Sequence, residues 1–223
     1  MQSPSVSTLL ILDCDGVLIR SEAANLAYYN RLFREFGLPE VRREDREPFL
    51  QLHTLSTPQV IDVFFPASAR EGARRFADGL GFEPFVSLVE PEPGWGLVLD
   101  RWRAAGGVVA VATNRGTSAS AVLSAVGLLS RVDHLVTIRD VARPKPHPDL
   151  LLQVLERVGR EARCSLYVGD SELDREAAAR AKVPFLGFRL PGGAIANSAA
   201  EVELWLSGLA SRECSATLLG AAT

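Results

Sequence analysis

Seven polar residues stand directly after apolar segments of the chain or in the loops that follow them. In chain order they are Asp13 and Asp15, Thr113 and Asn114, Lys145, and Asp170 and Asp174. Side chains alternate along an extended strand, so Asp13 and Asp15 project to one side and Cys14 projects to the other. Gly16 then allows the backbone to turn away sharply. The first pair of carboxylates therefore faces the same small volume.

These side chains suit the binding of a divalent cation together with a phosphoryl group. Carboxylates gathered on one side repel one another, and Asp170 adds to the repulsion unless a cation lies among them. Oxygen ligands without a histidine or cysteine nearby favour Mg²⁺ as the cofactor. Lys145 and the hydroxyl of Thr113 beside such a cluster suit a dianionic phosphoryl group. The residues therefore predict phosphoryl transfer.

Continuous apolar runs place these residues at the ends of strands. Strands are expected at 8–13, 108–113 and 164–168, with shorter ones at 134–138 and 183–188, and helical patterns lie between them at 97–104, 118–126, 148–158 and 174–181. Strands that are apolar throughout are typical of a parallel sheet covered on both faces. Their alternation with helices predicts a doubly wound α/β core, whose ligands bind outside the carboxyl ends of the strands.

One stretch, residues 21–89, interrupts this alternation and is predicted to be an all-helical insertion. Leu26, Tyr29, Phe33 and Phe36 recur at the spacing of one helix face, and further apolar residues follow at helical spacing between prolines. The Pro- and Gly-rich segment 90–96 marks the return to the core. The sequence thus predicts a discontinuous core of residues 1–20 and 90–223, with a loose end from about residue 211.

Composition excludes several classes of protein. The chain has 223 residues, 47% of them hydrophobic, and a formal net charge of −3, so no basic stripe serves a nucleic-acid partner. No apolar run is long enough for a bilayer crossing or a signal peptide, which favours no membrane partner and a cytoplasmic location. The three cysteines, widely spaced, are expected to be reduced thiols. The sequence carries no signal for an oligomeric state.

The ordered motifs resemble those of the haloacid-dehalogenase-like hydrolases, most closely the phosphoglycolate-phosphatase-like branch. The resemblance covers nearly the whole chain and rests on four segments, in order: Asp13-Cys14-Asp15-Gly16-Val17, Val111-Ala112-Thr113-Asn114, Arg143-Pro144-Lys145-Pro146-His147-Pro148 and Gly169-Asp170-Ser171-Glu172-Leu173-Asp174. It implies a Rossmann-like core, a mobile cap formed by the helical insertion, and Mg²⁺-dependent hydrolysis of a small phosphorylated metabolite.

The resemblance also implies a role for each matching residue. Asp13 would be the nucleophile that forms an aspartyl-phosphate, and Asp15 would be the general acid and base. Thr113 and the backbone amide of Asn114 would hydrogen-bond the phosphoryl oxygens, and Lys145 would neutralise charge. The implied metal ligands are Asp13, the backbone carbonyl of Asp15, and Asp170, with Asp174 in support.

Each of these residues also has a plain structural explanation. Asp174 begins a helix and could act mainly as its N-terminal cap. Lys145 could be a solvated loop charge, but it is one of only two lysines in an arginine-rich chain, and a compact ammonium suits a point charge. Weaker candidates for substrate contact, for which surface pairing, packing or capping is the commoner role, are Arg20, Arg115, His53 and His147.

Several related activities are weighed against phosphatase activity. Haloacid dehalogenation is disfavoured because Asp15 is present, and phosphonate cleavage because the helical insertion contains no lysine for a Schiff base. A sugar phosphomutase of the β-phosphoglucomutase kind shares the predicted site and stays open, as does a pyrophosphatase. A non-catalytic module that binds a phosphorylated ligand is disfavoured because Asp13, Asp15 and Lys145 are all retained.

Overall fold

A six-stranded parallel sheet forms the centre of the core. The structure is a computed structural model that describes residues 9–210, with the side chains of 208–210 left aside. The strand order is β5-β4-β1-β6-β7-β8, and all neighbours are parallel. The strands are β1 (Leu9–Leu12), β4 (Val108–Thr113), β5 (His134–Thr137), β6 (Ser165–Gly169), β7 (Phe185–Phe188) and β8 (Ile195–Ala196). The predicted doubly wound α/β sheet is therefore confirmed.

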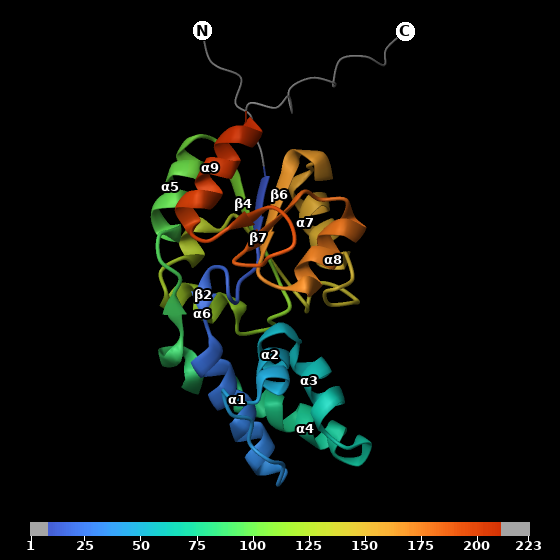
Figure 1. Cartoon of the computed structure of the whole chain (residues 1–223). Coiled ribbons are helices and arrows are strands. Elements are labelled where there is room, and N and C mark those ends of the chain that lie inside the picture. The colour runs from blue at the N-terminus through green and yellow to red at the C-terminus, as the bar shows by residue number, and fades with distance from the viewer. Residues whose placement is uncertain (1–8, 211–223) are drawn as a thin grey trace, which may run out of the picture.

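Helices cover both faces of this sheet (Figure 1). They are α5 (Trp95–Ala104), α6 (Ala119–Ala125), α7 (Asp149–Val158), α8 (Glu172–Ala181) and α9 (Ala199–Ala210). Alternate residues of β1 serve the two faces: Leu10 and Leu12 pack in one buried cluster with α5, α6 and α9, and Leu9 and Ile11 pack in another with α7 and α8. This double burial explains why the central strand is apolar at every position.

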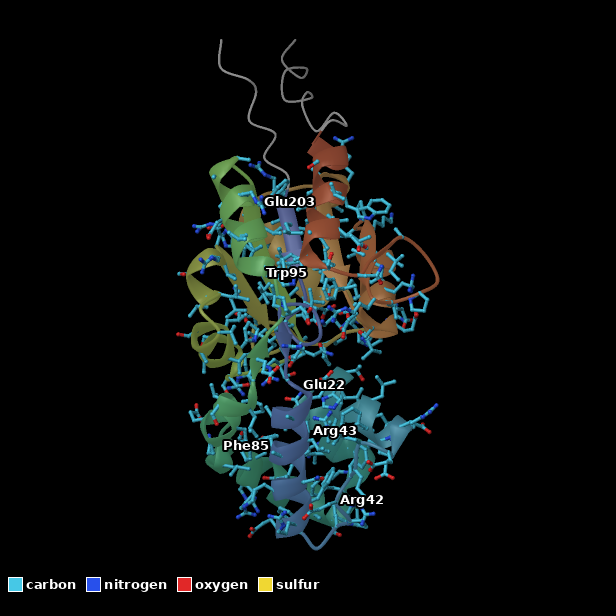
Figure 2. The ribbon with its side chains drawn as sticks, turned by 60° about the vertical axis from the view of Figure 1, so that its left-hand side comes forward. Glu22, Arg42, Arg43, Phe85, Trp95 and Glu203 are labelled. Carbon is cyan, nitrogen blue, oxygen red and sulfur yellow. The ribbon has the colours of Figure 1, made fainter. Side chains whose placement is uncertain are left out.

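The helical insertion lies beyond one end of the sheet (Figure 1). It contains α1 (Glu22–Glu35), α2 (Arg46–Thr54), α3 (Thr57–Phe64), α4 (Ala67–Leu80) and the short 3-10 helix η1 (Glu83–Leu88), and no strand lies between α1 and η1. Figure 2 shows Phe85 on this side of the molecule and Trp95 within the sheet-containing part. The insertion's aromatic side chains pack mainly on one another, including Phe33 with Phe64 and Phe65.

The two passages between core and insertion are paired with each other. The two-residue strands β2 (Ile19–Arg20) and β3 (Glu90–Pro91) form an antiparallel ladder. The Trp95 indole donates a hydrogen bond to the carbonyl oxygen of Val17 at 2.6 Å. Glu92 is buried and forms an ion pair with Arg189 at the end of β7. The entry and exit of the insertion are therefore fixed side by side.

The structure differs from the expectations in a few elements. β2, β3 and β8 have only two residues each, too short to give a hydropathy pattern. α2 has a single buried residue, Leu52, so its sequence shows no clear apolar face. Cys14 is a buried free thiol, but Cys164 is disulfide-bonded, so the prediction of three reduced thiols is wrong. Among the described residues no helix is long and apolar enough to span a membrane. The end predicted to be loose, from residue 211, lies outside the described residues.

The close approach of Gly169 to Asp174 gives a testable prediction. A Cβ atom at Gly169 would lie 2.4 Å from Asp174 Cβ and 2.6 Å from its Cγ. We expect Gly169→Ala to lower the free energy of unfolding by about 1–3 kcal/mol, because a buried clash forces a backbone shift. Gly79→Ala is the control, because nothing lies within 4 Å of its added Cβ and alanine favours the helix. Equal urea midpoints for the two variants would contradict this packing.

Candidate active site

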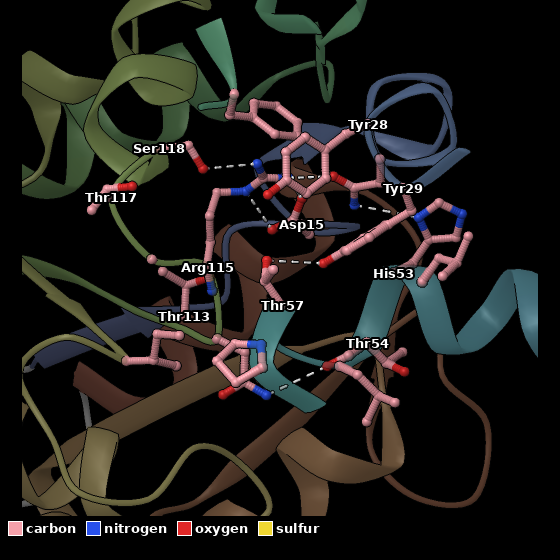
Figure 3. A pocket seen from close by; sticks show the side chains of 18 of the residues that line it. Asp15, Tyr28, Tyr29, His53, Thr54, Thr57, Thr113, Arg115, Thr117 and Ser118 are labelled. Carbon is pink, nitrogen blue, oxygen red and sulfur yellow. Dashed lines mark hydrogen bonds and ion pairs between the residues drawn. The ribbon is translucent and has the colours of Figure 1, made fainter. Parts of the chain in front are cut away.

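A cavity of about 590 Å³ lies at the carboxyl edge of the sheet, between the core and the helical insertion (Figure 3). Its walls bring together six of the seven residues predicted from the sequence: Asp13, Asp15, Thr113, Asn114, Lys145 and Asp170. The seventh, Asp174, has no exposed surface and supports the wall from behind. The predicted convergence of these side chains is therefore what the structure shows, whereas their individual chemical roles stay predictions.

Asp13 and Lys145 form a buried ion pair at the base of the cavity. The Nζ atom of Lys145 lies 2.8 Å from Asp13 Oδ1, and both side chains are at most 10% exposed. The contact is electrostatic in character, because no group in the described part of the chain donates a well-aligned hydrogen bond to Asp13 Oδ1. Burial raises the pKa of Asp13 to about 7, against the attraction of Lys145. The negative charge of Asp13 therefore depends on its cationic partner, Lys145.

Lys145 is held by a network that extends behind the cavity. Its ammonium contacts Asp174 Oδ1 at 2.7 Å and donates to the hydroxyl of Tyr167 at 3.1 Å. The Tyr167 hydroxyl in turn donates to the same Asp174 oxygen at 2.5 Å. Burial disfavours the charge on Asp174, but Lys145 outweighs it and lowers the pKa of Asp174. Asp174 is therefore a buried anion that fixes the lysine.

Asp174 also stabilises the start of α8. Its Oδ2 atom accepts hydrogen bonds from the backbone amide and the hydroxyl of Ser171, and its own amide donates to that hydroxyl. This is a capping box, in which Ser171 is the N-cap and Asp174 is the third helical residue. Asp174 is therefore not the N-cap itself, but its Oδ2 atom takes part in capping α8. Its Oδ1 atom supports the site through Lys145 and Tyr167.

An acidic cluster in the described part of the chain could hold a metal ion. Carboxylate oxygens of Asp13, Asp170 and Asp174 lie within 4.8 Å of one another. Burial and the nearby Asp174 raise the pKa of Asp170 well above its usual value, which shows that this group lacks sufficient counter-charge. The absence of a side chain at Gly16 leaves space for the Asp170 carboxylate, since a Cβ atom at residue 16 would lie 1.8 Å from Asp170 Oδ2. The hard oxygen donors of this cluster fit Mg²⁺.

Asp15 faces a different partner, Arg115. Arg115 Nε and one terminal nitrogen donate to the two carboxylate oxygens of Asp15, at 3.0 and 2.5 Å. The hydroxyl of Ser21 donates to the same carboxylate. Burial opposes ionisation of Asp15, but Arg115 outweighs it and lowers the pKa of Asp15. In this state Asp15 carries no proton to donate, so a role as general acid requires one of its two oxygens to be released from Arg115 and protonated.

Thr113 and Asn114 organise the end of β4. The Thr113 hydroxyl accepts a hydrogen bond from the Arg115 amide at 3.0 Å. The Asn114 side chain accepts from the Lys145 amide at 2.8 Å and donates to the Lys145 carbonyl oxygen at 3.3 Å. Asn114 therefore positions the lysine loop, a function beyond the predicted contact of its backbone amide with phosphate.

The weaker candidates separate into two groups. Arg115 and His53 line the cavity, whereas Arg20 forms an exposed ion pair with Glu90, 2.9 Å away. His147 is not among the cavity-lining residues, and its backbone amide closes a turn onto Pro144. Burial lowers the pKa of His53 to about 4, so this ring is neutral near pH 7.

Sequence reasoning missed three residues that shape the site: Tyr167, Ser21 and Asn25. Tyr167 lies in an apolar strand, where its ring alone accounts for its burial. Ser21 and Asn25 are buried polar residues one helical turn apart, and Asn25 donates to the Ser21 hydroxyl at 3.3 Å. Polar residues recurring on the apolar face of a predicted helix were the available signal.

The buried lysine gives a prediction for the metal-free protein. Lys145→Met should lower the free energy of unfolding by about 3–5 kcal/mol near neutral pH, because two buried carboxylates lose their counter-charge. In the wild type, Lys145 lowers the pKa of Asp174. The stability that the Lys145–Asp174 ion pair contributes is therefore lost only when the pH falls through this lowered pKa. In the variant, burial without the ammonium raises the pKa values of Asp13 and Asp174. Both carboxyl groups then take up protons as the pH falls, so the loss in the free energy of unfolding becomes smaller.

We therefore expect the stability difference between wild type and Lys145→Met to narrow from about pH 8 to about pH 5. Urea denaturation in EDTA measures it. Lys182→Met is the matched control, because Lys182 is exposed and should give no such difference at either pH. A gap that widens on acidification would contradict the ion-pair assignment.

Comparison with known proteins places the chain in a family. A family model described as haloacid dehalogenase-like hydrolase matches residues 10–188. A phosphoglycolate phosphatase from Xanthomonas campestris pv. campestris (strain 8004) is 30% identical over 191 residues, 81% of this chain and 84% of the relative. A probable phosphatase, IndB, from Dickeya dadantii (strain 3937) is 31% identical over 189 residues, 80% of each chain.

A solved structure agrees with these sequence matches. A subfamily IA hydrolase of the same superfamily from Geobacter sulfurreducens PCA superposes with a TM-score of 0.77 at 35% identity, and the match covers 87% of this chain and 97% of that one. The family predicted from the four motifs is thus confirmed, and with it the prediction of an enzyme. The chain belongs to the haloacid dehalogenase-like hydrolases.

Proposed function

We propose that this protein is a Mg²⁺-dependent phosphatase that hydrolyses a small phosphomonoester through an aspartyl-phosphate on Asp13. The observation that carries the proposal is the buried Asp13 carboxylate, whose Oδ1 atom lies 2.8 Å from the Lys145 ammonium at the base of the cavity. A carboxylate so placed is suited to nucleophilic attack on phosphorus. The phosphatase names of two relatives support the same reaction.

The first half of the reaction transfers the phosphoryl group to the protein. An oxygen of Asp13 forms a bond to phosphorus, and the bond between phosphorus and the ester oxygen breaks. Asp15, with one oxygen released from Arg115 and protonated and the other still held by Arg115, gives its proton to the departing alkoxide. Lys145 and Thr113 lie along the same wall, where their donors can stabilise the charge that spreads over the phosphoryl oxygens.

The second half restores the enzyme. Asp15, now a carboxylate, takes a proton from water as the water oxygen attacks phosphorus, and the bond to Asp13 breaks to release inorganic phosphate. The carboxylate form of Asp15 is the one that the pair with Arg115 favours. Asp15 therefore alternates between a protonated state that Arg115 holds through one oxygen and a deprotonated state that Arg115 holds through both.

Mg²⁺ is the cofactor that the acidic cluster fits best. Asp13 and Asp170 would hold it, as the motifs predict, together with the backbone carbonyl of Asp15; Asp174 stays engaged with Lys145 and would act from the second layer. When bound, the ion supplies positive charge that offsets the repulsion between the carboxylates and the phosphoryl group. The residues themselves supply the nucleophile, the proton transfers and the orientation.

The helical insertion, residues 21–89, is proposed to act as the cap that selects the leaving group. It supplies part of the cavity wall opposite the nucleophile, including Tyr28, Tyr29 and Thr57. A cavity of about 590 Å³ is of the size that accommodates a small metabolite. A short-chain phosphomonoester, of the kind named for the phosphoglycolate phosphatase relatives, is the substrate class that we propose.

Metal dependence is the first test of this proposal. Mg²⁺ should support phosphate release from a panel of phosphomonoesters, whereas Ca²⁺ should not replace it, because its larger and looser coordination suits the compact cluster poorly. Phosphate release is measured after EDTA treatment and again after adding back each cation. Full activity in EDTA would contradict the metal assignment. Isomerised sugar phosphate without net phosphate release would instead indicate a phosphomutase, and cleavage of pyrophosphate alone a pyrophosphatase.

Covalent trapping is the second test. Asp13→Asn should abolish phosphoenzyme formation, because an amide is a poor nucleophile. Asp15→Asn should still accept phosphate slowly from an activated aryl ester, because p-nitrophenolate leaves without a proton. Rapid quench with labelled ester and mass mapping locate the adduct. Asp100→Asn, a surface carboxylate paired with Arg131, is the control expected to retain activity; an adduct on a residue other than Asp13 would refute the assignment.

A further inference from the structure

Arg115 is fully engaged although it lines the cavity. Its side chain is only 7% exposed. Two of its nitrogens donate to Asp15, and the third donates to the Ser118 hydroxyl at 3.2 Å. Asp15 lies in the loop after β1 and Ser118 precedes α6, so these partners belong to the core. Arg131, which pairs with Asp100 on the surface, is much more exposed, at 31%.

The remaining partners of Arg115 belong to the helical insertion. A terminal nitrogen of Arg115 donates to Asn25 Oδ1 in α1 at 2.8 Å. The guanidinium carbon lies 4.4 Å from the centre of the Phe82 ring, which precedes η1. The position of the guanidinium therefore depends on both parts of the molecule.

These contacts close into a ring of hydrogen bonds; Figure 3 shows the part of it in which Arg115 meets Asp15. Arg115 donates to Asp15 and to Asn25, Asn25 donates to Ser21, and Ser21 donates back to Asp15. A contact of 3.3 Å between Asn25 Nδ2 and His53 Nδ1 fixes the orientation of the amide, because the neutral ring can accept there. Three of the five residues, Ser21, Asn25 and His53, lie in the insertion or at its entry.

We propose that Arg115 is a positioning residue that couples the placement of the helical insertion to the direction of the Asp15 carboxyl group. The proposal rests on the proposed function, in which Asp15 exchanges protons with the leaving group and with water. A bidentate guanidinium fixes both the position and the plane of a carboxylate, which a single ammonium cannot do. A displacement of α1 or Phe82 removes partners of Arg115 and so releases Asp15.

A double-mutant cycle of Arg115 with Asp15 tests this coupling. The measured quantity is the rate of phosphoryl transfer to the enzyme in a single turnover. The two esters are glycerol 2-phosphate, whose alkoxide must be protonated, and p-nitrophenyl phosphate, whose phenolate need not be. For glycerol 2-phosphate we expect Arg115→Met to slow transfer by about 100-fold, the lower range of a general-acid contribution. For the aryl ester we expect less than about a threefold loss, with KM for both esters little changed.

In the Asp15→Asn background, Arg115→Met should cost less than about twofold further, because residues that act through one another are not additive. Arg115→Lys should restore part of the rate, since it keeps the charge and loses the bidentate contact. Arg131→Met is the matched control, because Arg131 makes the same bidentate contact with Asp100 on the surface. Asn25→Ala should slow transfer less than Arg115→Met does, and again more for glycerol 2-phosphate than for the aryl ester. If Arg115→Met does not fold, Asn25→Ala takes its place in the cycle.

The opposite outcomes are distinct. The proposal would be overturned if Arg115→Met slowed phosphoryl transfer equally for both esters. It would also be overturned if Arg115→Met slowed transfer as much in the Asp15→Asn background as in the wild type. Either result would show that Arg115 acts on the substrate directly. A wild-type enzyme that transfers phosphate from neither ester would refute the proposed function, and the coupling would fall with it. Normal wild-type transfer with an additive cycle would refute the coupling alone.

Discussion

The rest of the site depends on one buried cation. Lys145 is 3% exposed and stands between Asp13 and Asp174, which are almost equally buried. Two carboxylates in such surroundings cannot both stay ionised without a counter-charge, because desolvation costs each of them several kcal/mol. The ammonium therefore allows acids to gather at the ends of neighbouring strands. The contacts of Tyr167 and Asn114 then fix the lysine where that charge is required.

The fold supplies the rigidity that this charge arrangement needs. The carboxyl ends of β1, β4 and β6 lie side by side in the sheet, so the loops that carry Asp13, Thr113 and Asp170 begin from adjacent positions. β1 is buried on both faces by separate helical layers, and its register with β4 and β6 is set by four consecutive pairs on each side. Asp13, the proposed nucleophile, follows this constrained strand and so has little freedom to move away from Lys145.

The same physics decides what could be predicted from the sequence. Continuous apolar strands leave a strong pattern, and the polar residues that end them stand out, so the sheet and the seven converging residues were predictable. Arg115 was identified only as a weak candidate, because its partner Asp15 is 100 residues away and no local pattern records such a pairing. Tyr167 has the hydrophobic bulk expected of a core residue, and its hydroxyl matters only because Lys145 arrives from a distant loop. The disulfide of Cys164 left no spacing signal.

The two buried ion pairs of the site differ in a way that suits the roles proposed for Asp13 and Asp15. The ammonium of Lys145 contacts Asp13, Asp174, Tyr167 and a β4 carbonyl oxygen, all of them in the core, so motion of the helical insertion leaves these bonds intact. Arg115 instead divides its bonds between the core and the insertion. A nucleophile must keep one position throughout a two-step reaction, whereas a group that first gives and then takes a proton must change its partners. The fixed pair serves Asp13, and the pair that spans the two parts of the molecule serves Asp15.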